Sequence, residues 1–333
     1  MSGARAFALA LAPLLILAGC GPKPVAAPPA PPPVPLHLAP ACDLAPSAGV
    51  EWVLEAKPRA LTELPDLIPV IALVVPEARF DTFTAAHGGV DVRQIQELCV
   101  AKYKDTLLSL ARAPFDAARI EKTFVERVTK PGGRQLDVPS PPVVRLWGEV
   151  NGEPQQVVTF GRELVALEQG RAGPIRAAEA FAQGKLRRAS PVLRSGSLAR
   201  AVEVVGEAPL RAFAPGPFEG ELAQGLGGLM RASTAVAASA RFVGAPARIA
   251  LRVVLTGAWG KDAPAAAERL AAAVHVVSES PFGRLLGLHR PVVAPQVHTV
   301  EDALIVELTI DGTALARGLH DALDAEIGEI MRR

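Results

Sequence analysis

Aromatic side chains are scarce in this chain of 333 residues. Phe, Tyr and Trp together make up 5% of the sequence, with a single tyrosine, Tyr103, and three tryptophans. Proteins that hold sugars or nucleobases by stacking normally present several exposed rings along a groove. The shortage of rings therefore argues against a stacking platform for carbohydrates or bases.

An excess of charge of either sign is also missing. The chain carries 35 basic and 34 acidic side chains. Binding to nucleic acid, or to an anionic membrane through a polybasic patch, needs a surplus of Lys and Arg. The balance therefore predicts that nucleic acid is not a partner.

Motifs of the common catalytic and cofactor sites are absent as well. The sequence has no HExxH zinc motif, no phosphate-binding loop of the Walker type and no GxSxG nucleophile elbow. The glycine-rich stretch 225–228 lacks GxGxxG spacing, and His275, His289 and His298 lack the spacing of metal ligands. We therefore expect no metal, no cofactor and no enzymatic activity.

The first 20 residues, by contrast, have the three parts of a secretion signal. Arg5 and the amino terminus form a short positive region, and residues 6–17 form an uncharged, apolar run. This run is shorter than the ~20 apolar residues that a helix needs to cross a bilayer. Two small residues, Ala18 and Gly19, then precede Cys20.

The sequence Leu17-Ala18-Gly19-Cys20 resembles the lipobox of bacterial lipoproteins. The resemblance implies that residues 1–19 are a signal peptide and that lipidated Cys20 begins the mature chain, carrying acyl chains such as palmitate. Each buried CH₂ contributes roughly 0.8 kcal/mol, so two or three acyl chains anchor a protein stably. It also implies attachment to a membrane of the bacterial cell envelope. Gly21, in place of Asp, is compatible with the outer membrane on its periplasmic side.

Proline is concentrated directly after this cysteine. Residues 21–46 hold ten of the 31 prolines. Such a segment has too few apolar side chains to form a core, so we expect a spacer rich in polyproline II over 20–46. At ~3.1 Å per residue it would reach roughly 60–80 Å when extended. It is either a plain linker or a segment that holds the folded part away from the membrane or docks a partner.

Two cysteines remain once Cys20 is acylated, namely Cys42 and Cys99. An even number of cysteines in an oxidising compartment favours a disulfide. That bond would attach the start of the folded part to a predicted strand at 98–104. The alternative is two separate buried thiols, because cysteine is among the most buried residue types.

The rest of the chain contains two similar successions of elements. Asp116 and Asp262 each end a strand-like run and are suited to cap a helix, whose apolar side chains recur at offsets of one, four, eight and twelve. We therefore predict an α+β fold of two tandem β-α-β-β-α-β-β-α units, 47–190 and 191–333. Antiparallel-rich sheets with helices packed on one face are expected, and one continuous sheet is the alternative.

The elements expected in each unit follow from periodicity. In the first unit they are strands at 67–75, 98–104, 106–111, 143–150, 155–160 and 163–167, with helices at 77–86, after Asp116 and at 174–182. In the second unit they are strands at 208–214, 235–243, 249–256, 292–300 and 303–310, with helices at 218–231, after Asp262 and at 313–331.

Together these features favour an envelope lipoprotein whose ectodomain is a non-catalytic binding or structural component. The expected partners are the membrane, through the lipid anchor, and an envelope protein or a small ligand. A cleft between the two units is the default ligand site, and an exposed sheet edge is the alternative docking surface. The alternative function is an envelope hydrolase with an unrecognised site in that cleft.

Overall fold

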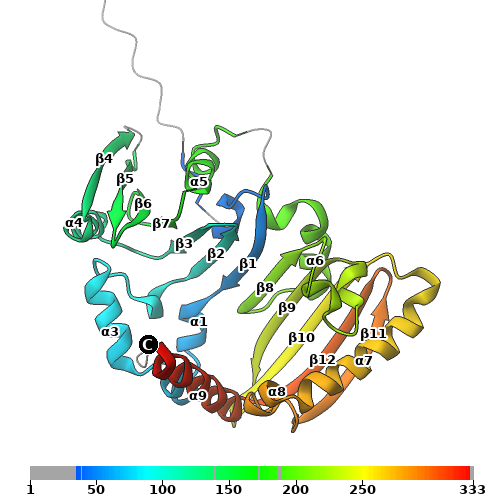
Figure 1. Ribbon diagram of the computed structural model, residues 1–333. Helices are drawn as coiled ribbons and strands as arrows, with labels where there is room; N and C mark the ends of the chain where they lie inside the picture. Colours follow the sequence, from blue (N-terminus) through cyan, green and yellow to red (C-terminus); the bar gives the residue numbers. More distant parts are fainter. Residues whose placement is uncertain (1–34, 39, 138–139, 172, 187–189, 331–333) are drawn as a thin grey trace, which may run out of the picture. The chain divides into compact units, whose positions relative to one another are not determined.

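The computed structural model describes residues 35–330 apart from 39, 138–139, 172 and 187–189, with only the backbone of 323–330. Cys20 and the predicted signal peptide lie outside the described residues. The described residues belong to one compact unit. Its strands form an antiparallel sheet of 12 strands in the order β11-β12-β10-β9-β8-β1-β2-β3-β7-β6-β5-β4 (Figure 1).

The strands alternate with helices and short 3₁₀ turns along the described chain. The strands are β1 (Val50–Ala56), β2 (Glu97–Tyr103), β3 (Thr106–Arg112), β4 (Lys130–Asp137), β5 (Val143–Val150), β6 (Glu153–Phe160), β7 (Leu164–Gln169), β8 (Leu210–Pro215), β9 (Ser233–Val243), β10 (Arg248–Gly257), β11 (Val293–Val300) and β12 (Ala303–Asp311). The helices are α1 (Pro58–Thr62), α2 (Ile68–Val74), α3 (Glu77–Ala86), α4 (Ala117–Arg127), α5 (Pro174–Ala182), α6 (Gly196–Val205), α7 (Ala263–Glu279), α8 (Pro281–Leu285) and α9 (Gly312–Ile330). The 3₁₀ turns are η1 (Ala41–Leu44), η2 (Val92–Gln94), η3 (Val192–Arg194), η4 (Leu222–Gln224), η5 (Leu229–Ala232) and η6 (Gly260–Asp262).

The α+β class and the antiparallel sheet are confirmed, and the two halves of the chain share that sheet. The joint is the pair formed by β1 and β8, which runs from Val53 opposite Phe213 to Ala56 opposite Leu210. The continuous sheet, which the sequence left as an alternative, is therefore the observed arrangement.

The strand order follows the same plan on both sides of this joint. In each half three consecutive strands lie side by side, β1-β2-β3 and β8-β9-β10. The third of them then pairs with the strand that precedes the final helix of its half, β7 or β12. The two halves thus repeat a pattern of strand neighbours, although the first half begins with β1 and not with the predicted strand at 67–75.

Helices cover both faces of the sheet, whereas the sequence predicted them on one face. One face packs against η1, α5 and α6 in a core that includes Val53 and Phe213 and runs through both halves. The opposite face packs against α4 around Phe124 and against α7 around Leu270. The prediction was wrong because inner strands are apolar on both sides; residues 303–306 of β12 are four consecutive buried positions.

One predicted strand is a helix. Residues 67–75 contain α2, and Leu67, directly before the helix, recurs at helical spacing with Val70 and Val74. They pack against Ala316 of α9. A run of apolar residues does not by itself distinguish a strand from a helix, and the contact with α9 decides between them here.

One predicted helix is replaced by turns. Residues 218–231 contain the 3₁₀ turns η4 and η5 in place of a continuous helix. Gly220, Gly227 and Gly228 have φ angles of 58°, 68° and 84°. A right-handed helix does not tolerate positive φ, so these glycines end it before it can propagate.

The packed part of the chain begins inside the predicted spacer, 20–46. Its buried residues there are Leu38, Ala41, Cys42, Leu44 and Ala45. These small and apolar side chains join the core on the α5 and α6 face. The proline-rich composition continues into this stretch, which is why the composition alone placed the boundary too late.

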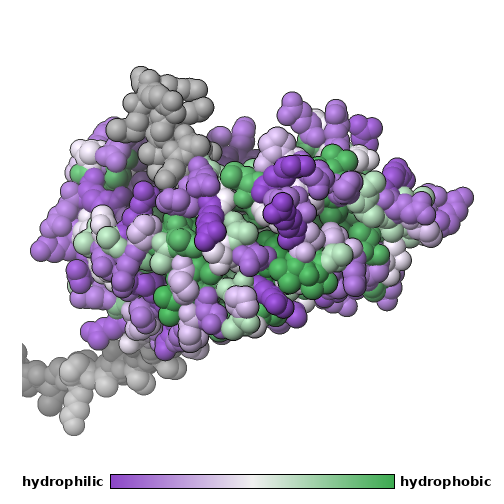
Figure 2. All heavy atoms as spheres, turned by 90° about the horizontal axis from the view of Figure 1, so that it is seen from below, coloured by the Kyte–Doolittle hydropathy of each residue, from purple (hydrophilic) through white to green (hydrophobic). Residues whose placement is uncertain are grey.

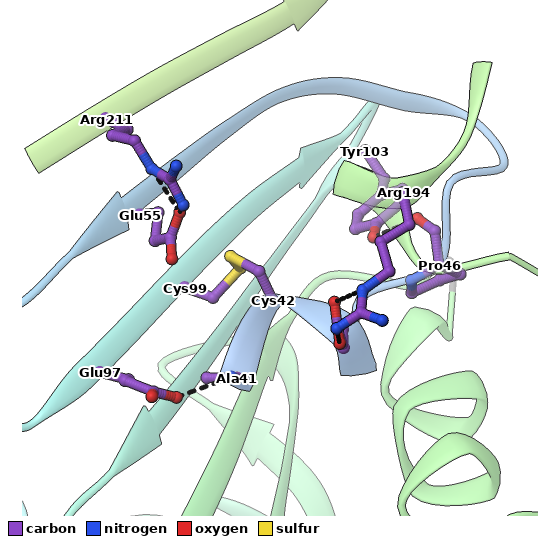
Figure 3. The surroundings of a disulfide bond; sticks show 10 residues. Ala41, Cys42, Pro46, Glu55, Glu97, Cys99, Tyr103, Arg194 and Arg211 are labelled. Atoms are coloured by element: carbon purple, nitrogen blue, oxygen red, sulfur yellow. Dashed lines mark hydrogen bonds and ion pairs between the residues drawn. A yellow bond between two sulfur atoms is a disulfide. The ribbon is translucent and has the colours of Figure 1, made fainter. Parts of the chain in front are cut away.

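Contacts with β2 hold this first segment in place (Figure 3). Cys42 and Cys99 form a disulfide, with their Cα atoms 5.2 Å apart. The Ala41 N–H donates a hydrogen bond to the Glu97 carboxylate at 2.9 Å, and the Tyr103 hydroxyl donates one to the Pro46 carbonyl at 2.7 Å. One covalent bond and two hydrogen bonds therefore attach the start of the folded part to β2.

Candidate ligand-binding pocket

An apolar cavity of about 330 Å³ lies on the α4 side of the sheet in the first half of the chain. Its floor includes a row of cross-strand neighbours, Val100 on β2, Ser109 on β3 and Leu167 on β7. A second row, two residues along each strand, continues the floor. Side chains that share a face of neighbouring strands stand side by side, so the floor is an apolar surface with a single hydroxyl group.

The walls come from α4 and from the segment between α3 and β2. Phe83 of α3 and His87, directly after that helix, lie on one side, and Phe124 and Arg127 of α4 lie on the other. Of the 17 residues around the cavity, 12 are apolar and five are polar. The polar ones are His87, Ser109, Thr123, Arg127 and Gln169.

A glycine lets the two walls meet. A Cβ atom at Gly88 would lie 2.6 Å from the Cα atom of Ile120 on α4, and the φ angle of Gly88 is +66°. A larger side chain would therefore have to displace the α4 backbone and also adopt a strained conformation. Gly88 closes the cavity on this side by allowing the turn to rest directly on α4.

The cavity exists because α4 leaves part of the sheet uncovered. α4 has 11 residues and packs over β5 and β6, whereas α7 has 17 residues. On the same face of the second half, α7 is joined by Leu229 and the buried Trp259, which complete the core there. In the described part of the first half, the side chains that pack beside α4 on this face, among them Ile95 and Phe115, leave part of the apolar floor over β2 and β3 open.

The α3 wall depends on ion pairs more than on buried contacts. α3 buries none of its own side chains. Arg93 on η2 pairs with Asp81 at 2.9 Å and with Glu77 at 3.4 Å. Exposed ion pairs of this kind contribute about 0–1 kcal/mol each. Of the two helical walls, α3 therefore has the weaker hold on the rest of the fold.

The surroundings of His87 lower its pKa and so favour the neutral imidazole. Its Nδ1 atom lies 2.9 Å from the Phe83 carbonyl, which can only accept, so Nδ1 carries the proton and Nε2 has a free lone pair. The imidazole also stacks on the Phe83 ring, with centroids 3.9 Å apart. Burial lowers the pKa of His87, the hydrogen bond to Phe83 opposes that shift, and the charge of Arg127 adds to it.

Arg127 brings a positive charge to the cavity. It is half-buried and lies in the last turn of α4. A cation there interacts favourably with the helix dipole. Within the part of the chain that the structure describes, it forms no hydrogen bond or ion pair. The acidic residues of α4 form ion pairs with other side chains. Glu121 pairs with Arg134 at 3.3 Å, and Glu126 pairs with Lys122 at 3.8 Å.

The ligand site that the sequence predicted, a cleft between the two units, is occupied by paired strands. At that joint the buried Arg211 of β8 and the half-buried Glu55 of β1 form an ion pair, which Figure 3 shows beside the disulfide. Val53 and Phe213 fill one face of the joint. The pocket residues Phe83, His87 and Arg127 were not singled out in the sequence, because they converge only when α3, α4 and the sheet pack together.

The structure places some of the histidines that the sequence noted close together. His275 and His289 line a shallow pocket with Glu279, and the Nδ1 atom of His289 is buried without a hydrogen bond. Among the described residues, no group of three or more His, Cys, Asp or Glu is arranged to hold a metal ion.

Apolar side chains are also exposed at the surface, over α7 and α8. The most exposed large ones there are Val276, at 68%, and Phe282, at 61%. Seen from below, which is the side of α8 and α9 in Figure 1, hydrophobic patches alternate with hydrophilic ones (Figure 2). In the described residues, no helix combines the length and the apolar character needed to cross a membrane.

Comparison with known proteins yields one distant likeness of fold. No protein-family model matches the chain, and no curated protein matches it. A solved structure described as crystal form IV of TP0453 aligns with 83% of this chain and 96% of its own, at 11% identity and a TM-score of 0.46. A likeness at this level carries no argument about the pocket.

Proposed function

We propose that this protein is a lipid-anchored lipoprotein of the bacterial envelope whose folded part binds an apolar small molecule in the pocket between α3, α4 and the sheet. The anchor would be Cys20, at the outer membrane facing the periplasm. The protein acts as a binding component in this proposal and does not catalyse a reaction. One observation carries the binding function, namely the apolar cavity of about 330 Å³.

Size and lining both support this role. Binding pockets for small molecules commonly have volumes of roughly 300–1,000 Å³ and mostly apolar walls with a few polar groups. The cavity has this composition, with 12 apolar and five polar residues. An apolar ligand on the floor gains roughly 25 cal/mol for each Å² that it removes from water. Displacement of the lightly held α3 wall would give it a route in.

A neutral fluorescent probe tests the binding function. The folded part is titrated with N-phenyl-1-naphthylamine, whose emission rises in an apolar environment. We expect saturable binding to the unaltered protein. We expect Ser109→Phe to weaken it at least tenfold, because the new ring would occupy the centre of the floor.

Val125→Phe is the matched control for this titration. Val125 lies on α4 next to Phe124, is 59% exposed and does not line the cavity. It adds a ring of the same kind outside the pocket, so binding should be unchanged. Equal binding by the Ser109→Phe variant and the unaltered protein, or no saturable binding at all, would rule out the proposed pocket.

The anchor is tested separately in intact bacterial cells. We expect the unaltered protein to stay in the membrane pellet until detergent is added. The Cys20→Ser variant should lose the lipid and appear in the soluble fraction. Identical processing of both proteins, with release of both into buffer, would contradict the lipoprotein proposal.

A further inference from the structure

We infer that the ligand of this pocket is a long-chain carboxylate, such as a fatty acid, whose head group pairs with Arg127 while its chain lies on the apolar floor. This inference rests on the proposed binding function and adds the chemical class of the ligand. It joins two observations, the apolar cavity and, at its wall, a guanidinium that pairs with no anion among the described residues.

Charge complementarity points to an anionic head group. Arg127 lines the cavity and has no carboxylate partner among the described residues. The other polar groups around the cavity, including Ser109, Thr123 and Gln169, carry no charge. A half-buried guanidinium without an anion gains from binding one, because charge-assisted hydrogen bonds are stronger than neutral ones.

A single cation favours a singly charged head group over a phosphate. Arg127 is the one permanently charged residue among those that line the cavity. The neighbouring His87 donates its Nδ1 proton to the Phe83 carbonyl and presents a lone pair at Nε2. A carboxylate balances the charge of Arg127 with two oxygens that match the guanidinium fork. A phosphate monoester would bring a surplus of negative charge next to the lone pair of His87.

Burial on the apolar floor supplies the binding free energy of the alkyl chain. The apolar strip consists of Val100, Leu167 and the apolar residues of the second row, and it crosses the three neighbouring strands β2, β3 and β7. Each methylene group removed from water contributes roughly 0.8 kcal/mol. A flexible alkyl chain can follow such a strip, whereas a rigid polar molecule would leave its own hydrogen-bonding groups unsatisfied.

Three ligands with the same alkyl chain separate the head-group effect from the apolar one. Dodecanoate, dodecan-1-ol and dodecyl phosphate are titrated at about pH 8 and low salt, with N-phenyl-1-naphthylamine displacement as readout. We expect the unaltered protein to bind dodecanoate at least tenfold more tightly than dodecan-1-ol, and more tightly than dodecyl phosphate. Arg127→Met should abolish the preference for dodecanoate and leave the binding of dodecan-1-ol intact.

Arg119→Met is the matched control, since Arg119 lies on the same helix, is exposed and does not line the cavity. It removes the same charge, so the preference for dodecanoate should persist. Arg127→Lys should retain part of the preference for dodecanoate that Arg127→Met loses. Equal binding of dodecanoate and dodecan-1-ol by the unaltered protein, or tighter binding of dodecyl phosphate, would overturn the carboxylate assignment and leave the pocket standing. Failure of all three to displace a bound probe would overturn the alkyl-chain ligand, whereas absence of saturable probe binding would remove the proposed function itself.

Discussion

Burial lowers the pKa of His87, and this shift in one residue has a measurable effect on stability. Burial is the main cause that lowers the pKa of His87 below its usual value near 6.5. The unfolded chain therefore takes up a proton at a higher pH than the folded chain. Stability that is complete above about pH 6.5 is lost as the pH falls through the lower folded-state pKa.

We predict that His87→Gln reduces this acid-dependent loss. A glutamine does not titrate, so the difference in the free energy of unfolding between about pH 7.5 and pH 5.5 should be smaller in the variant than in the unaltered protein. Urea unfolding at both pH values measures it. The lost stacking on Phe83 lowers stability equally at both values and cancels in the comparison. An unchanged difference would show that His87 is not the responsible group.

The disulfide between Cys42 and Cys99 also affects stability, because it closes a loop between residues 57 positions apart in the chain. We predict that Cys42→Ala/Cys99→Ala lowers the free energy of unfolding by about 2–4 kcal/mol, because the unfolded chain regains freedom. Chemical denaturation measures this change. A reductant should destabilise the unaltered protein to a similar extent and should not affect the variant. A reductant effect of equal size on both proteins would contradict the assignment.

Among the elements, α9 shows how close packing can reverse a helix propensity. Alanine normally stabilises a helix relative to glycine by roughly 0.5–1 kcal/mol. At Gly318, however, a Cβ atom would lie 2.0 Å from the Leu285 carbonyl oxygen of α8. The two helices can approach this closely because the side chain is absent.

We therefore predict that Gly318→Ala destabilises the protein, by about 1–3 kcal/mol, as overpacked sites do. Thermal unfolding followed by circular dichroism measures the shift. Arg317→Ala is the matched control, because Arg317 is the exposed neighbour on the same helix and surface changes usually stay within about 0.5 kcal/mol. An increase in stability for Gly318→Ala would mean that α8 and α9 are not in contact.

At the scale of the whole molecule, the two halves share a sheet and a core. The β1–β8 pair crosses the joint, and one core runs from Val53 in the first half to Ile305 in the second. The ion pair of buried Arg211 and half-buried Glu55 also lies at the joint.

We predict that both halves unfold in one transition, and tryptophan fluorescence reports on each half. The Trp259→Phe variant keeps Trp52 and Trp147 in the first half, and the Trp52→Phe/Trp147→Phe variant keeps Trp259 in the second. In each variant the urea midpoint by fluorescence should coincide with that by circular dichroism. Fluorescence midpoints on opposite sides of the circular dichroism midpoint would instead show that 47–190 and 191–333 are independent domains.

Local patterns were sufficient for much of the secondary structure. Asp116 caps α4 through a hydrogen bond from the Arg119 N–H, and α5 has the predicted bounds. The strands at 98–104 and 106–111 were predicted nearly to the residue as β2 and β3. These elements were predictable because capping, periodicity and alternation act over a few neighbouring residues. The lipobox is equally local, and its cysteine remains a prediction.

Only the tertiary structure decided how these elements combine and where a ligand could bind. The β1 strand at 50–56 was missed, although its pairing with β8 joins the two halves. Residues 67–75 became a helix because α9 packs against them. The pocket needed Arg127, His87 and the β2–β3 floor to converge from separate elements. Such contacts depend on residues far apart in the chain, whose pairing no short pattern specifies.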